Sequence, residues 1–366
     1  MLSCTTATKA VLVACLTLVW GCAAQPRDPS GDDGAVTPAD NAAVKLVQIT
    51  GLPGDVEARD RVLAKLQTTL PERARYFVAL RPFARAYAKA DDPATDDPAL
   101  DRAVQNAESD LYAAASAPWP AQRHPLIAAW IQTNAPHLDA LVAAAAGGRY
   151  WMPMRDTTPA MARVIQIQQT LTQQAAAALA ARAMRRLHDG DALAAWQETL
   201  ALQRLATLML RCTADTAAPR GTHLYPAMSI SLLADTAVIA IAQYSQATPA
   251  QLTAMLRQLR ALPVLPTDRD SLYGQARARH LLAALSLALA AYYGDHQTFP
   301  PRLDALVPVY SDAVPADPLA SPRKTPVYRV SQDQAVVYSL GANGQDDGGH
   351  PEFDIVLEMI PPTRPR

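Results

Sequence analysis

Apolar residues recur every three or four positions along most of the chain between residues 41 and 266. This spacing places them on one face of a helix, so it predicts a body built of successive amphipathic helices. Leucine and alanine keep this spacing on both sides of the sequence His-Asp-Gly-Asp at 188–191. We expect an antiparallel helical hairpin here, with Gly190 in the turn and Asp191 as the N-cap of the second helix. No fixed period near 34 residues is visible, which favours an irregular bundle or a short solenoid over a regular repeat array.

Prolines and capping residues mark the expected helix starts. Proline is tolerated at the first helical position because the N–H it lacks would be unpaired there. Helices are therefore expected to begin near Pro71, Pro98 and Pro136. Thr248 and Gln251 form a capping-box pattern ahead of a further helix, in which each side chain can satisfy a free backbone N–H.

The pattern changes near residue 270. One amphipathic to apolar helix is predicted from there to about Gly294, and shorter segments punctuated by proline follow it. Three of these segments are rich in valine, tyrosine, isoleucine or phenylalanine and are bounded by polar turns, which predicts strands at 327–330, 335–340 and 353–359.

The expected fold class is therefore α+β. An irregular all-α body of helical hairpins over residues 41–266 is followed by a helix and a small antiparallel three-stranded sheet over residues 270–366. A chain of 366 residues exceeds the usual size of one domain, which agrees with this division into two. The net charge of −1 gives no indication of nucleic-acid binding.

The first residues read as an export signal. Lys9 precedes an apolar run that is too short for a comfortable membrane span, and the run ends in Leu-Val-Trp-Gly-Cys at 18–22. This ending resembles the lipobox of bacterial lipoproteins, which implies a signal peptide over 1–21 and a lipid on Cys22. Cys15, which follows Leu-Val-Ala, and secretion without a lipid remain alternatives. The Pro-, Gly- and Asp-rich segment 22–40 is expected to be a flexible tether.

The lipobox resemblance sets the expected location and the cysteine count. It implies a protein anchored by palmitate-type acylation in the bacterial envelope and facing the periplasm, and Ala23, where an aspartate would favour inner-membrane retention, favours the outer membrane. Cys4 and Cys15 leave with the signal and Cys22 is acylated, so Cys212 remains alone and no intramolecular disulfide is expected in the mature chain. A lone cysteine in a helix is most often a small buried apolar residue.

The helical body shows no catalytic motif in its sequence. Histidines are scattered without metal-ligand spacing, and no HExxH, GxSxG, Walker A or GxGxxG pattern occurs. Carboxylates that could serve an envelope hydrolase, whose partners need not be close in sequence, are Glu57, Asp156 and Glu198. The aromatic and methionine cluster at 150–154 could line a binding groove or anchor a loop in the core.

The last quarter of the chain resembles a known family. A long helix leads to Phe299-Pro300, then to Asp317-Pro318 and to two strands around Ser-Leu-Gly-Ala-Asn-Gly at 339–344, with a closing Asp-Ile at 354–355. In this order the segment resembles the C-terminal head of G-class pseudopilins of type II secretion. The resemblance implies a helix with a small antiparallel sheet, and partners among secretion or pilus subunits. The chain as a whole also resembles a group of exported bacterial proteins of unknown function.

The same resemblance implies calcium. In G-class pseudopilins the loop before the last strand binds Ca²⁺, which prefers six to eight oxygen ligands. The corresponding residues here are Asn343, Asp346, Asp347 and Asp354. Asn343 stands where the family has an aspartate, and this removes one carboxylate. The alternative is a polar Gly- and Asp-rich turn whose acidic side chains are only solvated.

Three functions therefore remain open at this point. The sequence favours a non-catalytic, lipid-anchored envelope protein that binds or scaffolds an unknown protein partner. The second is an accessory component of a type II secretion or pilus-like apparatus, although a lipoprotein signal replaces the prepilin leader and long apolar helix of true pseudopilins. The third, an envelope hydrolase, lacks any visible constellation of catalytic residues.

Overall fold

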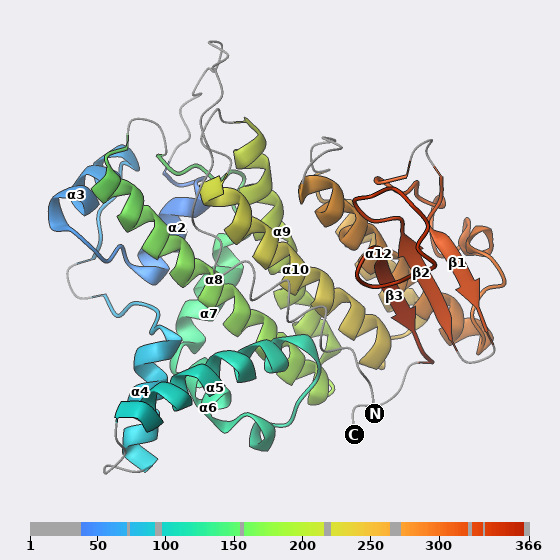
Figure 1. The fold of residues 1–366 in the computed structure, drawn as a ribbon, viewed down its shortest axis with the longest axis horizontal. Helices are drawn as coiled ribbons and strands as arrows, with labels where there is room; N and C mark the ends of the chain where they lie inside the picture. Colours follow the sequence, from blue (N-terminus) through green and yellow to red (C-terminus); the bar gives the residue numbers. More distant parts are fainter. Residues whose placement is uncertain are drawn as a thin grey trace.

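The computed structural model gives the predicted α+β architecture. It describes residues 38–71, 74–91, 97–153, 157–215, 221–263, 272–320, 324–331 and 334–361. The predicted signal peptide 1–21, Cys22 and nearly all of the tether lie outside these residues. Figure 1 shows a large helical bundle with the small sheet at one end of it, and helix α12 between the two.

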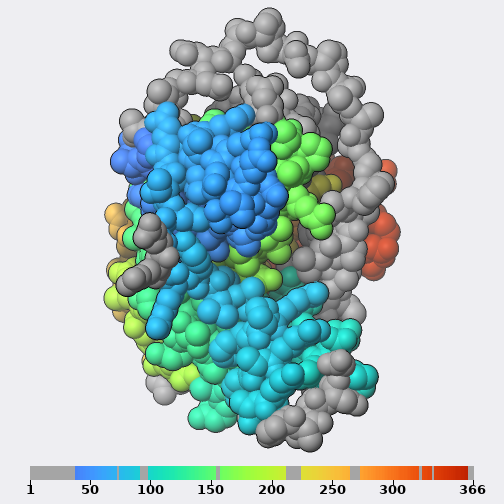
Figure 2. All heavy atoms as spheres, turned by 90° about the vertical axis from the view of Figure 1, so that its left-hand side faces the viewer, coloured from blue at the N-terminus to red at the C-terminus, as the bar shows by residue number. Residues whose placement is uncertain are grey.

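Eleven α-helices and two short 3₁₀ segments make up the helical part of the described residues. Their bounds are α2 Ala42–Thr50, α3 Val56–Lys65, α4 Leu80–Asp91, α5 Asp97–Ser116, η1 Ala121–Arg123, α6 Pro125–Thr133, α7 Ala135–Ala144, α8 Pro159–His188, α9 Ala192–Asp215, α10 Gly221–Tyr244, α11 Pro249–Arg260, α12 Leu272–His296 and η2 Leu303–Leu306. At the end of the bundle far from the sheet, the segments α2 to α4 form much of the surface, as Figure 2 shows.

The longest helix, α8, is the centre of the bundle. It contacts α5, α9 and α10 along its length and also reaches α2, α3, α6 and α7. Its stretch 175–181, which is alanine except for Leu179, is buried throughout. Small side chains let neighbouring helices approach closely, and alanine has the highest helix propensity, so the composition of α8 suits a helix that is surrounded.

The predicted hairpin around Gly190 is confirmed. Helix α8 ends at His188, Gly190 adopts φ +86° in the turn, and the backbone N–H of Ala194 donates to Asp191 Oδ1 at 3.0 Å. A left-handed φ is easy only for glycine, so this residue allows the chain to reverse within three positions. Helices α8 and α9 then pack against each other. The capping box is also formed, with both Thr248 and Gln251 bonded as predicted.

The helix predicted to begin at Pro71 is wrong in its first half. Residues 74–79 form no helix, and α4 begins only at Leu80. The backbone N–H of Val78 donates to Asn134 Oδ1 at 2.8 Å, and Asn134 Nδ2 donates back to the carbonyl of Val78 at 3.2 Å. A buried side-chain amide thus replaces the intrahelical partners, which sequence periodicity cannot reveal.

Helix α10 is apolar enough to be mistaken for a membrane span. Residues Leu224–Tyr244 have the length and composition of a membrane-crossing helix, but 67% of their most apolar window is buried inside the protein. Helix α10 packs against α8, α9 and α12. Its apolar surface is therefore used in the core of the bundle.

The C-terminal sheet follows the predicted order. Strands β1 Val327–Val330, β2 Ala335–Ser339 and β3 Ile355–Met359 form an antiparallel sheet with β2 in the middle. The register pairs Val330 with Ala335 and Ser339 with Ile355. Strands β2 and β3 pack on α12, and α12 also packs on α10 and α11. The predicted boundary between residues 41–266 and 270–366 falls between α11 and α12.

Candidate functional site

The loop that joins β2 to β3, residues 340–354, contains the four predicted calcium ligands. Gly341 begins its first turn with φ +65°, and a Cβ atom on it would lie only 1.8 Å from the carbonyl oxygen of Phe353. The two ends of the loop therefore lie so close together that a side chain at position 341 would collide with the backbone of Phe353, which requires glycine at this position. The acidic residues lie between these ends.

Asp354 is the buried carboxylate of the loop. Asp354 lies just before β3 and is only 4% exposed. Its Oδ2 accepts a hydrogen bond of 2.8 Å from the backbone N–H of Gly349, whereas Oδ1 is buried and has no hydrogen-bond partner. A buried oxygen without a partner is costly, so Asp354 Oδ1 is the atom of this loop that a cation or a water would satisfy.

Asp346 is bonded to Tyr338 of β2. Its Oδ1 accepts from the Tyr338 hydroxyl at 2.8 Å and from the Gly348 N–H at 3.0 Å. The bond from Tyr338, followed by that from Gly348, lowers the pKa of Asp346. Burial, together with the bond to Asp346, raises the pKa of Tyr338. Asp346 is thus an exposed carboxylate held by two hydrogen bonds, one to a side chain of β2 and one within the loop.

Asn343 and Asp347 form a separate pair at the exposed tip of the loop. Asn343 Nδ2 donates to Asp347 Oδ2 at 2.7 Å, and Asn343 Oδ1 accepts from the N–H of Gln345. Within the described residues no three acidic, histidine or cysteine side chains are gathered as metal ligands usually are. Asn343 and Asp347 are engaged in bonds to each other and to the loop, so Asp354 Oδ1 is the one oxygen of the four expected ligand residues that is buried and unpartnered in the described residues. Calcium binding by this loop therefore stays a prediction.

Asp317, which the sequence places in an Asp-Pro pair, anchors this loop. Asp317 is 2% exposed, and its Oδ1 accepts from the Ser339 hydroxyl at 2.7 Å while its Oδ2 accepts from the Leu340 N–H at 3.1 Å. The N–H of Leu319 also donates to Oδ1. Because Ser339 is the last residue of β2 and Leu340 follows it, Asp317 fixes the point from which the loop starts. Its role here is structural.

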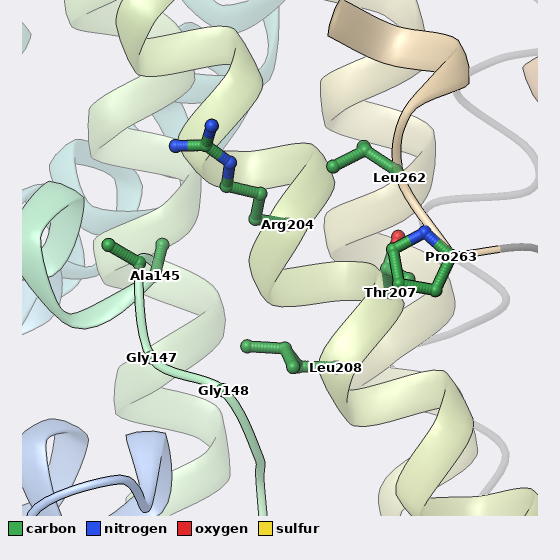
Figure 3. Close-up of a pocket in the computed structure, with 9 residues that line it drawn as sticks. Ala145, Gly147, Gly148, Arg204, Thr207, Leu208, Leu262 and Pro263 are labelled. Atoms are coloured by element: carbon green, nitrogen blue, oxygen red, sulfur yellow. The ribbon is translucent and has the colours of Figure 1, made fainter.

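A second candidate site is a groove on the helical body. It has a volume of about 380 Å³ and is lined by residues 145–148, Arg204, Thr207, Leu208, Leu262 and Pro263. Figure 3 shows Arg204, Thr207 and Leu208 on one face of α9, between the chain that follows α7 and the chain that follows α11. We call this feature the α9 groove. Its composition is mainly apolar, with one guanidinium and one hydroxyl.

The carboxylates considered for hydrolysis are not brought together in the described residues. Glu57 is an exposed residue of α3 paired with Arg61, and Glu198 is a buried residue of α9. Asp156 lies outside the described residues. The closest charged neighbours of Glu198 are Arg182 Nε at 2.6 Å and Arg186 Nε at 3.2 Å.

Glu198 belongs to a buried ion-pair network between α7, α8 and α9. Arg182 also pairs with Asp139 at 2.9 Å. Burial raises the pKa of Glu198 to about 7, against the opposing effect of the two guanidinium groups. Removal of one partner from a buried ion pair is destabilising, because it leaves the other charge buried without compensation. Glu198 thus joins α9 to α8 through two guanidinium groups, and the one other carboxylate of this described network, Asp139, binds the same Arg182.

Sequence reasoning missed a polar cluster between α9, α10 and α12. Asp235 is 2% exposed, and its Oδ1 accepts from Gln203 Nε2 at 2.7 Å and lies 3.1 Å from His280 Nδ1. In the sequence Asp235 only interrupts the apolar run of α10. The three residues come from helices far apart in the chain, so no local spacing could have indicated them.

The remaining residues that the sequence brought to attention lie in turns or in the core of the described structure. His188 lies at the end of α8 beside the Gly190 turn, and Tyr150 and Met152 are buried, with Trp151 packed partly against the core. The loop-anchor alternative for the cluster at 150–154 thus holds for these three residues. Met154 and the side chain of Cys212 lie outside the described part.

Comparison with known proteins gives no relative. No family model, no curated protein and no solved structure matches the chain.

Proposed function

We propose that this protein is a non-catalytic binding or scaffolding protein of the bacterial envelope, held at the membrane by a lipid on Cys22. The observation that carries the proposal is the α9 groove, an open and mainly apolar surface that includes a charged side chain without a partner in the described residues. Apolar grooves with a few polar groups are typical sites of recognition. The lipobox-like ending at Cys22 supports the location.

The anchor can be tested by labelling cells with palmitate. The expected result is that the wild-type chain takes up label and sediments with membranes, whereas Cys22→Ser does neither. Cys15→Ser is the matched control and should behave like the wild type if its change leaves export intact. Label retained in Cys22→Ser would sink the assignment of the lipid to this residue.

The binding function can be tested by photo-cross-linking in the native envelope. Large apolar side chains are exposed at Val56, Leu193, Val309 and Phe353, on well-separated parts of the chain. A photoreactive residue at each position, and at Leu208 in the α9 groove, should give a discrete adduct with one protein from at least one face. Diffuse or absent adducts from every position would contradict a binding role.

A second function, accessory component of a secretion or pilus-like apparatus, is supported by the C-terminal order of elements. Helix α12 leads through η2 and Asp317-Pro318 to the three antiparallel strands, as the pseudopilin resemblance implies. This alternative makes a distinct prediction. Adducts to a pilin-like subunit should then arise from Phe353 or Val309, which lie in the C-terminal part, and not from Leu208.

A further inference from the structure

We infer that the α9 groove binds an extended, acidic peptide segment of a partner protein. This inference deepens the proposed binding function and rests on it, because it names the surface and the chemistry of the partner. Three properties of the groove carry it: its charge, its apolar wall and its open main chain.

The side-chain charge of the groove is positive in the described part of the chain. No acidic side chain is among the described lining residues, and Arg204 makes no hydrogen bond or ion pair with them or with any other described residue. Arg211 lies seven positions further along α9, on the same face as Arg204 and Leu208, and it too is exposed without such a partner. Other exposed arginines of the helical body are of both kinds, since Arg81 and Arg85 pair with a carboxylate and Arg102 has no described partner. A carboxylate on a partner would find two guanidinium groups along one face.

The ends of two helices near the groove offset its positive charge only in part. The groove lies beside the C-termini of α7 and α11, where backbone carbonyls carry partial negative charge. Helix α11 has Arg257 and Arg260 in its own last turn, so its negative end is already balanced. Helix α7 has no basic residue in its last turn, but a helix end has only about half an elementary charge. The partial charge at the end of α7 is therefore smaller than the charge of Arg204, and a net positive charge remains among the described groups.

The side of the groove formed by the chain after α11 is apolar and suits aliphatic side chains. Leu262 and Pro263 lie on this side, and Leu208 adds a further apolar side chain from α9, as Figure 3 shows. The hydroxyl of Thr207, which lies next to Pro263 in Figure 3, makes no hydrogen bond within the described residues, whereas the hydroxyl of Thr199 in the same helix donates to the carbonyl of Ala195. A hydroxyl beside an apolar surface can accept or donate one bond to a bound chain.

The third wall is main chain. Gly148 has no side chain, a Cβ atom on it would meet nothing within 4 Å, and its N–H donates no hydrogen bond within the described residues. A bare backbone N–H next to open space can pair with the carbonyl of an extended peptide. This feature favours a peptide over an acyl chain, which has no use for a backbone donor.

The test selects peptides and then exchanges charges. A display library of random eight-residue peptides is selected on the mature chain, and the most enriched peptide is labelled with fluorescein and titrated by anisotropy. The expected peptides carry aspartate or glutamate next to aliphatic residues. Arg204→Glu should lower the affinity for the labelled peptide by about tenfold or more, because a charged hydrogen-bonded pair is lost and repulsion replaces it. The same peptide with lysine for its acidic residue should bind Arg204→Glu better than it binds the wild type.

Controls separate the groove from general electrostatics. Arg163 is an exposed residue of α8 with no described partner, so Arg163→Glu makes the same change of charge away from the groove. It should leave the affinity within a factor of two. Thr207→Val tests the hydroxyl at constant volume and is expected to cost about threefold to tenfold.

Three results would overturn the inference. They are enriched peptides without acidic residues, equal effects of Arg204→Glu and Arg163→Glu, and binding to phosphatidylglycerol vesicles in place of peptides. In each case a discrete photo-cross-link from Val56, Leu193, Val309 or Phe353 would leave the proposed binding function standing on another face. The two failures are therefore distinguishable.

Discussion

The carboxylate of Asp317 accepts a 2.7 Å hydrogen bond from the hydroxyl of Ser339, and both residues are buried. The other carboxylate oxygen accepts from the N–H of Leu340, and the N–H of Asp317 itself donates to the carbonyl of Lys324 at 2.7 Å. One side chain thus ties the segment before β1 to the end of β2. Since the acidic loop starts at this point, the position of Asp354 depends on Asp317 as well as on the strands.

Asp317→Ala should lower the free energy of unfolding by about 3 kcal/mol, because the change leaves the buried Ser339 hydroxyl without its acceptor and removes charge-assisted bonds. Denaturant unfolding followed by circular dichroism measures it. Asp304→Ala, at an exposed aspartate of η2, should change stability by less than about 0.5 kcal/mol. Similar effects of the two substitutions would mean that Asp317 does not hold the sheet.

Two glycines of the loop offer a matched comparison. Gly341 and Gly344 have nearly the same φ, +65° and +67°, so alanine is strained equally at both. A Cβ on Gly341 meets the carbonyl oxygen of Phe353 at 1.8 Å, whereas one on Gly344 meets nothing within 4 Å. Gly344→Ala should cost about 1 kcal/mol and Gly341→Ala at least 2 kcal/mol more, as unfolding free energies. Equal costs would show that the two loop ends can separate freely.

Much of the fold could be predicted from the sequence because its signals are local. The turn at Gly190 with the cap at Asp191, the capping box at Thr248 and strand β1 each depend on residues within a few positions of one another. The helix expected from Pro71 was wrong because Val78 is held by Asn134, a residue 56 positions away. Periodicity reports which face is apolar, and it contains no information about a distant side chain that replaces a helical hydrogen bond.

The candidate sites were less predictable for the same reason. The α9 groove is formed by segments that follow α7 and α11 together with one face of α9, and these meet only after packing. The pairing of Asp235 with His280 also joins separate helices. By contrast, the acidic loop is continuous in sequence, so Asp354 could be named in advance, although its unpartnered Oδ1 could not.

Calcium should stabilise the protein through Asp354. A cation that binds only the folded chain raises the free energy of unfolding by RT ln(1 + [L]/Kd). This is about 2.7 kcal/mol when the cation is in hundredfold excess over Kd. We expect millimolar Ca²⁺ to raise the melting temperature of the wild-type chain, an excess of chelator to reverse the rise, and Asp354→Ala to abolish it. Asp304→Ala controls for the loss of one negative charge and should keep the rise. An unchanged melting temperature in Ca²⁺ would mean that the loop is a polar turn.

Asn134→Ala tests the long-range anchor of the extended segment before α4. Asn134 is fully buried and bonds both the N–H and the carbonyl of Val78. Its loss leaves the Val78 N–H without its acceptor, and Trp130 Nε1 still donates to the Val78 carbonyl. We expect a loss of about 2–4 kcal/mol in unfolding free energy. Hydrogen exchange should show Val78 among the amides whose protection falls most, and uniform loss across the bundle would contradict this local role.

Glu198 should make stability depend on pH between 4.5 and about 7. Burial raises its pKa from 4.5 to about 7, although Arg182 and Arg186 oppose this and Asp139 adds to it. The folded chain then holds a proton that the unfolded chain releases, so the contribution is present below pH 4.5 and is lost as the pH rises through about 7. Between pH 4.5 and about 7 the wild type should lose up to about 3 kcal/mol of unfolding free energy relative to Glu198→Gln, as measured by denaturant unfolding. Glu57→Gln, at an exposed carboxylate, controls for the charge. If instead the wild type gained stability over Glu198→Gln as the pH rose, the two arginines would outweigh burial and Glu198 would be ionised throughout.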